Sequence, residues 1–154
     1  MKILLPFDGS PLALEAVRFA IRLGSDGLDT SAVLANVQEP ASLYELMVAH
    51  DPQVIEQVSA AAGANILLPA QALLDAAGIP YETEVAMGDP AHTLVDILEN
   101  YGCDMVVMGA SGTSALRSAL LGSVSNEVLH AAGVPVMIVK DGVIAQPATD
   151  EQTV

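Results

Sequence analysis

The chain is poor in basic and aromatic residues. Its 154 residues include five Lys or Arg against 19 Asp or Glu, a formal charge of −14, and no Lys or Arg lies between Arg22 and Arg117. Binding to nucleic acid or to an acidic membrane requires several basic side chains that replace the counterions of phosphates. Aromatic residues make up 3% of the chain and Trp is absent, so bases have little to stack on. We therefore expect neither nucleic acid nor membrane as a partner.

Cysteine and long apolar runs are also scarce. Cys103 is the one cysteine, so an internal disulfide is excluded, and we expect a small buried side chain. The three histidines are scattered without ligand spacing, so no metal site is expected. No stretch approaches the roughly 20 apolar residues of a membrane span, and Pro6 and Asp8 interrupt the first apolar run too early for a signal peptide. These features predict a soluble, cytoplasmic protein.

Apolar residues are abundant, at 52% of the chain with a mean hydropathy of +0.48. The length suits one compact domain. Short apolar runs of strand length alternate five times with segments of helical periodicity, which is typical of an α/β fold. We predict a single doubly wound, open parallel sheet of five strands with helices on both faces. The runs are Ile3 to Phe7, Ala32 to Val37, Ile79 to Val85, Met105 to Met108 and Val134 to Val139.

Three predicted helices share one start signal, a capping residue followed by proline. Ser10, Asp51 and Asp89 stand in the capping position, and a fourth helix is expected from Ser123. Pro69 lies inside the second of these segments and is expected to kink or break the helix. The run from Tyr81 to Val85 alternates polar and apolar residues and suits an edge strand. Residues 141–154 show no periodicity and are expected to form a mobile tail.

The stretch from Met108 to Ser125 is the most informative for function. It follows an apolar strand and leads into a helix, and its glycines let the backbone approach a ligand closely. Gly122 and Ser123 stand at the helix N-terminus, where free N–H groups and the helix dipole favour an anion. The stretch is neither a Walker A loop nor the dinucleotide fingerprint. Glycine and serine used merely as turn and cap residues explain the same pattern. Hydroxyl donors are available at Ser111, Ser123 and Ser125.

The spacing Gly109-x2-Gly112-x9-Gly122-Ser123 resembles the nucleotide-binding signature of the universal stress protein family. Three further blocks resemble the first strand and turn, the fourth strand and the last strand of that family: Ile3 to Ser10, Asp104 to Gly109 and Val134 to Val139. The resemblance implies a nucleotide-binding domain over residues 1–140 with strand order 3-2-1-4-5. It also implies a homodimer and, in members with the full glycine signature, ATP binding.

The resemblance implies a role for each site residue. Pro6 and Asp8 would lie beside the adenosine, and Val37 would offer its backbone to the adenine. Met108 and Gly109 would contact the ribose. The phosphates would be surrounded by backbone amides and hydroxyls of Gly112, Gly122, Ser123, Val124 and Ser125. The residues themselves add Ser111 as a further hydroxyl donor and Arg117 as either a phosphate contact or a solvated charge.

The loop departs from the family pattern in its charge. Family members often carry a basic residue soon after the second glycine of the signature, where Thr113 and Ser114 stand in this chain. Arg117 is the one cation of the loop. Amide dipoles, hydroxyls and a bound cation must therefore hold the phosphates, and we expect ATP affinity to depend on Mg²⁺ or Mn²⁺.

No nucleophile with a neighbouring base is visible in the sequence. This favours a binding or signalling protein, namely an ATP-binding stress-response homodimer paired through the strand Val134 to Val139, which is apolar and predicted at a sheet edge. Two alternatives stay open. One is slow ATP hydrolysis or phosphate transfer with Ser123 or Ser125 placing the γ-phosphate, and the other is a structural dimer without nucleotide.

Overall fold

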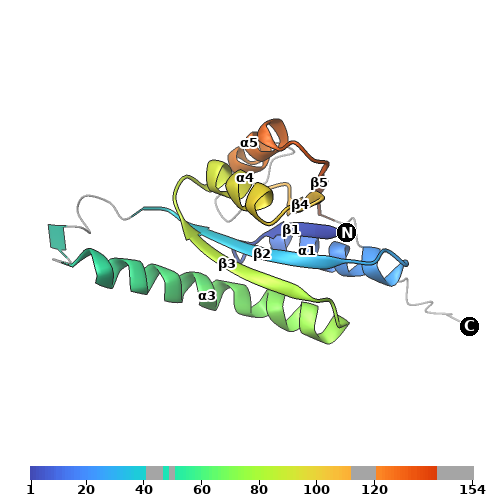
Figure 1. Ribbon diagram of the computed structural model, residues 1–154, viewed down its shortest axis with the longest axis horizontal. Helices are drawn as coiled ribbons and strands as arrows, with labels where there is room; N and C mark the ends of the chain where they lie inside the picture. The colour runs from blue at the N-terminus through green and yellow to red at the C-terminus, as the bar shows by residue number, and fades with distance from the viewer. Residues whose placement is uncertain (41–46, 49–50, 112–120, 142–154) are drawn as a thin grey trace, which may run out of the picture.

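The computed structural model describes residues 1–40, 47–48, 51–111 and 121–141. Its strands form one parallel sheet with the order β3-β2-β1-β4-β5, which confirms the predicted topology (Figure 1). Every pair of neighbouring strands is parallel, so all carboxyl ends lie at one edge of the sheet. The strands are β1 (Lys2–Pro6), β2 (Ser31–Gln38), β3 (Tyr81–Met87), β4 (Met105–Gly109) and β5 (Val136–Val139).

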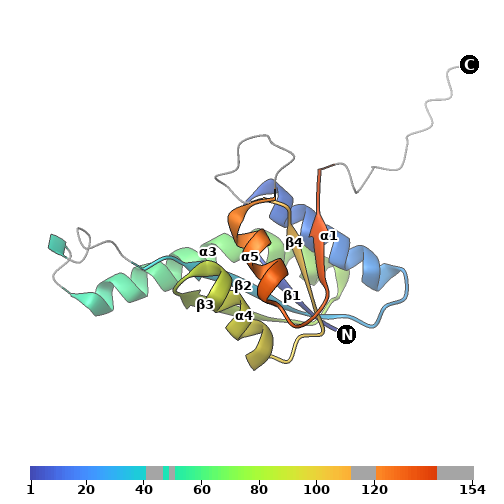
Figure 2. The same cartoon turned by 90° about the horizontal axis from the view of Figure 1, so that it is seen from above.

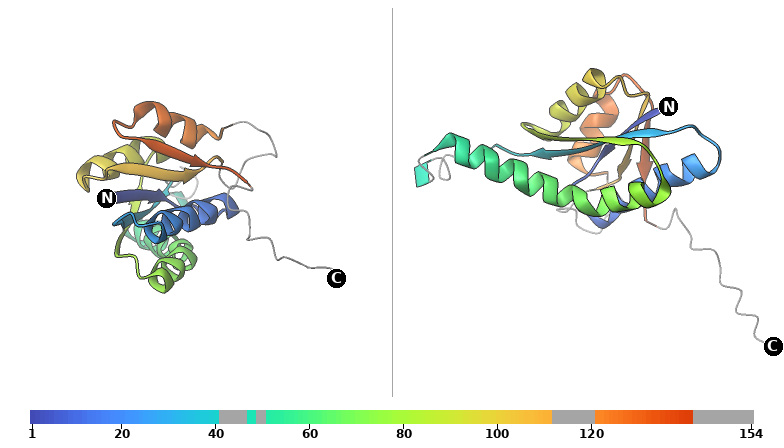
Figure 3. Two further views of the ribbon diagram at one scale, coloured as in Figure 1. Left: turned by 90° about the vertical axis from the view of Figure 1, so that its right-hand side faces the viewer. Right: turned by 60° about the horizontal axis from the view of Figure 1, so that its bottom comes forward.

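Helices cover both faces of the sheet, as predicted. The helices α1 (Pro11–Ser25) and α3 (Pro52–Ala77) lie on one face, and α4 (Pro90–Asn100) and α5 (Ser123–Ala131) lie on the other (Figures 1 and 3). Successive strand residues point to opposite faces, and the buried side chains accordingly form two clusters, one with α1 and α3 and one with α4 and α5. The strands β1, β2, β4 and β5 are mostly apolar because helices cover both faces of the sheet, whereas the edge strand β3 alternates polar and apolar residues.

The predicted helix starts are confirmed at Ser10, Asp51 and Asp89. The Ser10 hydroxyl accepts from Ala13 N at 3.2 Å, and the two aspartates accept from backbone N–H groups at 3.0 Å. Each cap is followed by proline, whose missing N–H is no loss in a first helical turn. The fourth helix begins at Ser123 as expected, but no side chain caps it.

Pro69 was expected to kink or break its helix, and the break is wrong. The helix α3 runs without interruption over 26 residues, about 39 Å at the usual rise per residue. Leu67, Ala70 and Leu74, on either side of the proline, are fully buried, while Pro69 itself faces outward. Packing against the sheet holds the helix together where proline cannot donate a hydrogen bond. The first part of α3 extends beyond the rest of the molecule (Figure 1).

Within the described residues, α3 also meets a length-and-composition test for a membrane span. Its most apolar 18-residue window has a mean hydropathy of 1.2, and 22% of that window is buried. The match rests on length and composition alone, and Leu67, Ala70 and Leu74 of the same helix are packed in the core beneath the sheet.

Two strands start later than predicted. The strand β3 begins at Tyr81 rather than Ile79, because Gly78 ends α3 with φ +69° and Ile79 N still donates to Leu74 O. It continues to Met87 and lies at the sheet edge, as its alternating pattern predicts. The strand β5 begins at Val136 rather than Val134. Cys103 is buried, which confirms its expected packing role.

A polar contact ties the edge strand β3 to the end of α4. The Tyr101 hydroxyl donates to Glu84 Oε2 at 2.7 Å. This hydrogen bond, helped by burial and by the negative charges of Glu84 and Glu82, raises the pKa of Tyr101 to about 12. Because the folded pKa lies above the unfolded value of about 10, the stabilisation is complete below about pH 10 and is lost as the pH rises toward 12.

We predict that Glu84→Gln lowers the pKa of Tyr101 toward about 10, because the neutral amide no longer opposes a tyrosinate. The measurement is a spectrophotometric titration of tyrosinate, with Tyr101→Phe identifying the component that belongs to this residue. Glu82→Gln serves as the control and should shift the pKa less. An unchanged Tyr101 pKa in Glu84→Gln would show that the hydrogen bond is not its cause.

Candidate functional site

The sheet opens between β1 and β4 at its carboxyl edge. These strands pair at two positions, Ile3 with Met105 and Leu4 with Val106, whereas β1 pairs with β2 through to Pro6. Even-numbered residues of β1 face β4, since Asp104 N donates to Lys2 O. The next backbone nitrogen of β1 that faces β4 is that of Pro6, which carries no hydrogen and cannot donate. The pairing of β1 with β4 stops there. The order of the strands reverses between β1 and β4, and this switch point is the usual place of ligand sites in open α/β sheets.

The end of β2 contributes an unpaired stretch of backbone beside this opening. Pairing of β1 with β2 ends at Pro6 opposite Ala35, and Phe7 N then donates to Ala35 O at 2.8 Å. Odd-numbered residues of β2 therefore present their N–H and C=O to the β1 side. Val37 follows in that register, past the last paired residue of β1. Its backbone donor and acceptor face the opening in the described part of the chain, which fits the role expected for this residue.

Pro6 and Asp8 lie where the chain leaves β1. Pro6 is half-buried and Asp8 is exposed. Oδ1 of Asp8 accepts from Ser10 N at 2.9 Å, which closes a tight turn before α1. Asp8 therefore stabilises the turn and is also the candidate ligand residue at the carboxyl end of β1.

The N-terminus of α5 lies at the same edge and differs from the other described helices. Side chains cap α1, α3 and α4, whereas α5 is capped by Gly122, which has no side chain to donate or accept. Gly122 N donates to Ala110 O at 2.7 Å and Asn126 N donates to Gly122 O at 2.9 Å. Among the residues that the structure describes, no side chain caps the intervening N–H groups of the first turn, so this terminus is suited to an anion.

At Gly109 and Gly122, two of the predicted site residues, neighbouring backbone leaves little room for a side chain. A Cβ on Gly109 would lie 2.9 Å from the backbone carbon of Leu12, so α1 packs directly on the end of β4. A Cβ on Gly122 would lie 3.1 Å from Cα of Ser111, so the two ends of the loop between β4 and α5 approach closely. These contacts bring Ser111, which is half-buried, beside the start of α5.

Three buried polar side chains of the described core all lie at this edge: Ser10, Asn36 and Ser125. Each binds backbone near a strand end. The hydroxyl of Ser125 donates to Gly109 O at 2.8 Å, so it ties β4 to α5 and its proton is already engaged. Asn36 donates to Phe7 O at 2.9 Å. The edge is therefore fixed by hydrogen bonds as well as by packing.

The structure brings together most of the residues that the sequence singled out. Met108 and Gly109 are buried at the end of β4, Ser123 is exposed and Val124 is half-buried at the start of α5. Gly112 and Arg117 lie outside the described residues. Pro6, Asp8, Val37, Met108, Gly109, Ser111, Gly122, Ser123, Val124 and Ser125 all belong to strand ends or helix starts of the carboxyl edge.

Sequence reasoning missed two residues at this edge. Asn36 interrupts an otherwise apolar strand, and that interruption was the available signal. Lys140 directly follows β5, whose last residue Val139 accepts from Ala110 N at 2.8 Å. The composition pointed to Arg117 as the cation of the site, but among the described residues Lys140 is the cation that stands at the carboxyl edge.

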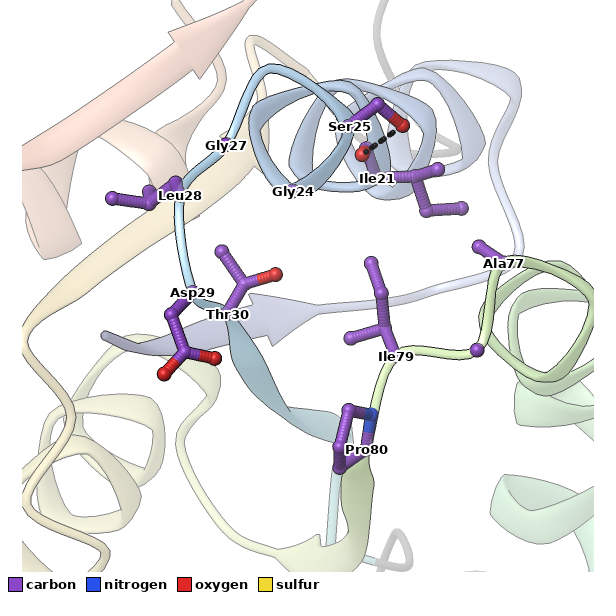
Figure 4. A pocket seen from close by; sticks show the side chains of 11 residues that line it. Ile21, Gly24, Ser25, Gly27, Leu28, Asp29, Thr30, Ala77, Ile79 and Pro80 are labelled. Atoms are coloured by element: carbon purple, nitrogen blue, oxygen red, sulfur yellow. Dashed lines mark hydrogen bonds between the residues drawn. The ribbon is translucent and has the colours of Figure 1, made fainter.

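A hollow of about 410 Å³ lies at the opposite, amino edge of the sheet (Figure 4). It is lined by the ends of α1 and α3 and by the loops that precede β2 and β3, including Gly24, Thr30 and Ile79. This hollow is remote from the site, because strand starts and strand ends lie at opposite edges of a parallel sheet. The candidate site lies at the carboxyl edge, where the strand order reverses and α5 begins.

Residues 1–140 match the model of the universal stress protein family. The chain belongs to this family. A universal stress protein from Methanocaldococcus jannaschii, MJ0531, is 30% identical over 139 residues, covering 90% of this chain and 81% of the relative. The family match over residues 1–140 includes all strands from β1 to β5.

Solved structures of other proteins share the fold of this universal stress protein. The MJ0577 structure has a TM-score of 0.78 at 25% identity, over 90% of this chain and 94% of the other. A universal stress protein solved in complex with cAMP has a TM-score of 0.62 at 26% identity, over 90% and 95% of the two chains. The fold is therefore one on which an adenine nucleotide has been observed.

Proposed function

We propose that this universal stress protein binds ATP at the carboxyl edge of its sheet and acts as a nucleotide-dependent signalling homodimer in the stress response. The observation that carries the proposal is the N-terminus of α5 without a side-chain cap, placed beside the opening that Pro6 leaves between β1 and β4. A similar protein crystallised with cAMP supports the choice of an adenine nucleotide. The ATP-binding subgroup is proposed from the glycine spacing, one member of which, Gly112, lies outside the described residues.

The backbone of Val37 supports adenine as the base. Adenine presents a hydrogen-bond acceptor beside an amino donor, and the N–H and C=O of one strand residue complement that pair. Guanine presents the reverse order at the corresponding atoms and leaves both backbone groups unpaired, which is costly at a half-buried site. Val37 therefore favours ATP over GTP.

The start of α5 supports a phosphate position. The first-turn N–H groups and the positive end of the helix dipole attract an anion without any basic side chain. Ser123 is exposed there and offers a hydroxyl, whereas the Ser125 hydroxyl is engaged with Gly109 O. Backbone dipoles neutralise only part of the charge of a triphosphate, so a divalent cation would share the task, as the sequence predicts.

We predict that the purified protein binds ATP in isothermal titration with Mg²⁺ and that affinity falls at least about tenfold in EDTA. Gly122→Val should abolish binding, because its branched side chain would press on Ser111 and Ala110 and open the loop. Ser123→Ala is the matched control at the next position and should weaken binding without abolishing it. No heat of binding for the unaltered protein with Mg²⁺ would overturn the proposal and favour a structural dimer. Release of ADP during incubation would instead establish the slow hydrolase.

Lys140 is placed to supply positive charge to the same site. Val136 and Ile138 of β5 pack with α5, whereas Met137 and Val139 pack with α1. Lys140 directly follows β5 and is exposed, and continued alternation would put it on the α5 side. Among the described residues it makes no ion pair, whereas Lys2, Arg18 and Arg22 each lie beside a carboxylate.

We predict that Lys140→Gln lowers ATP affinity about fivefold and leaves adenosine affinity unchanged, because the lost charge acts on phosphate alone. Titration calorimetry with both ligands measures the difference. Lys2→Gln removes a charge at the opposite edge of the sheet and should change neither affinity. Equal losses for ATP and adenosine would place Lys140 away from the phosphates.

The strand β5 supports the homodimer. It lies at the edge of the sheet. The carbonyl of Pro135, just before the strand, accepts from Val106 N, and the carbonyl of Val139 accepts from Ala110 N. Val136 and Ile138 therefore turn their N–H and C=O to the open side. An apolar edge with free backbone groups invites pairing with a second copy, and a two-fold axis would make the pairing antiparallel.

We predict a dimer in sedimentation velocity and a monomer for Ile138→Pro, because proline removes an outward N–H and leaves the bonds to β4 in place. Circular dichroism checks that the variant is folded. Leu68→Ala, on the exposed side of α3, is the control and should stay dimeric. Dissociation by Leu68→Ala alone would move the interface to α3.

A further inference from the structure

Asn36 is a polar residue inside the apolar core of β2. It is 4% exposed and both ends of its amide are used. Nδ2 donates to Phe7 O at 2.9 Å, and Oδ1 accepts from Gln38 Nε2 at 2.7 Å. A buried amide with both groups satisfied holds one geometry, because any rotation leaves a polar atom unpaired.

The helix α3 packs directly against the side-chain amide of Asn36. A Cβ on Gly63 would lie 2.9 Å from Asn36 Oδ1 and 2.4 Å from Cγ1 of Val85. The helix therefore rests directly on the amide and on β3 at that point, and Gly63 is the residue that permits the contact. Asn36 cannot move toward α3 to relax a change at the strand end.

The two chain segments that Asn36 joins are the two that flank the proposed base. Phe7 immediately precedes Asp8, at the exit of β1, and Val37 immediately follows Asn36, at the exit of β2. No strand pairing joins the segments here, because the register of β1 and β2 ends at Pro6 and Ala35. Beyond the Phe7 N to Ala35 O bond, the amide of Asn36 is the described link between the end of β1 and the end of β2.

We propose that Asn36 is a positioning residue that sets the preference for adenine by holding Val37 in register with the end of β1. The inference rests on the proposed binding of ATP at this edge. Two aligned hydrogen bonds to the Val37 backbone distinguish adenine from guanine, and alignment of both depends on the spacing of the two strand ends. Phosphate binding at α5 lies on other elements and does not depend on Asn36.

The experiment measures ATP and GTP affinity by titration calorimetry for the unaltered protein and for Asn36→Ala. The expected result is a preference for ATP in the unaltered protein and a fall of about tenfold in the ATP to GTP affinity ratio in the variant, the size of one aligned hydrogen bond. Melting temperature is recorded in parallel. A residue that only stabilises the fold would lower the melting temperature and leave the ratio unchanged.

Leu34→Val is the matched control. Leu34 lies on the same strand and the same face as Asn36 and is fully buried, so the substitution destabilises the core without touching the amide. Its ATP to GTP ratio should equal that of the unaltered protein. A ratio that falls equally in Leu34→Val would overturn the inference and attribute the effect to general loosening of the sheet.

Gln38→Ala keeps the test valid if Asn36→Ala does not fold. Gln38 is only half-buried, and its loss removes the bond that orients the amide while Asn36 remains. The ratio should fall in the same direction by a smaller factor, about threefold. An unchanged ratio in Gln38→Ala and in any folded Asn36→Ala would overturn the positioning role while ATP binding stands. Absence of ATP binding in the unaltered protein would overturn both proposals.

Discussion

The missing N–H of Pro6 is the constraint on which the site depends. The ladder between β1 and β4 closes at Ile3 and Leu4 and stops where proline cannot donate. A residue with an N–H at this position could extend the ladder and narrow the opening at the switch point of the sheet. The turn at Asp8, the free backbone of Val37 and the start of α5 all border that opening. The pairing between β1 and β4 is thus confined to Ile3 and Leu4 of β1.

The acidity of the chain and its proposed ligand are compatible because the site is built from backbone. A charge of −14 excludes a broad basic surface, and the described edge offers N–H groups, a helix dipole and hydroxyls in place of one. Lys140 adds a single charge at the end of β5. Under the proposed function, such a site would hold a compact, cation-bound phosphate chain, whereas binding of a long polyanion such as nucleic acid requires many charges in a row.

The buried hydrogen bonds at the carboxyl edge show how the fold and the site share residues. Ser10 caps α1, Ser125 holds the end of β4 and Asn36 holds the end of β1. Each satisfies a backbone group that strand pairing or helix formation leaves open, which is why polar side chains are tolerated at these core positions. Rigid strand ends keep free backbone donors in fixed positions, and fixed donors are what an anion or a base edge recognises.

The sequence by itself determined the alternation of strands and helices and the helix starts at Ser10, Asp51 and Asp89, because periodicity and capping are local properties. The resemblance supplied the strand order and the residues of the glycine loop. Tertiary structure decided that α3 continues through Pro69, since burial of Leu67, Ala70 and Leu74 outweighs one lost hydrogen bond. It also decided the contact of Gly63 with Asn36 and the placement of Lys140 at the site edge. Both features depend on distances between segments far apart in the chain, and a local sequence pattern does not contain such distances.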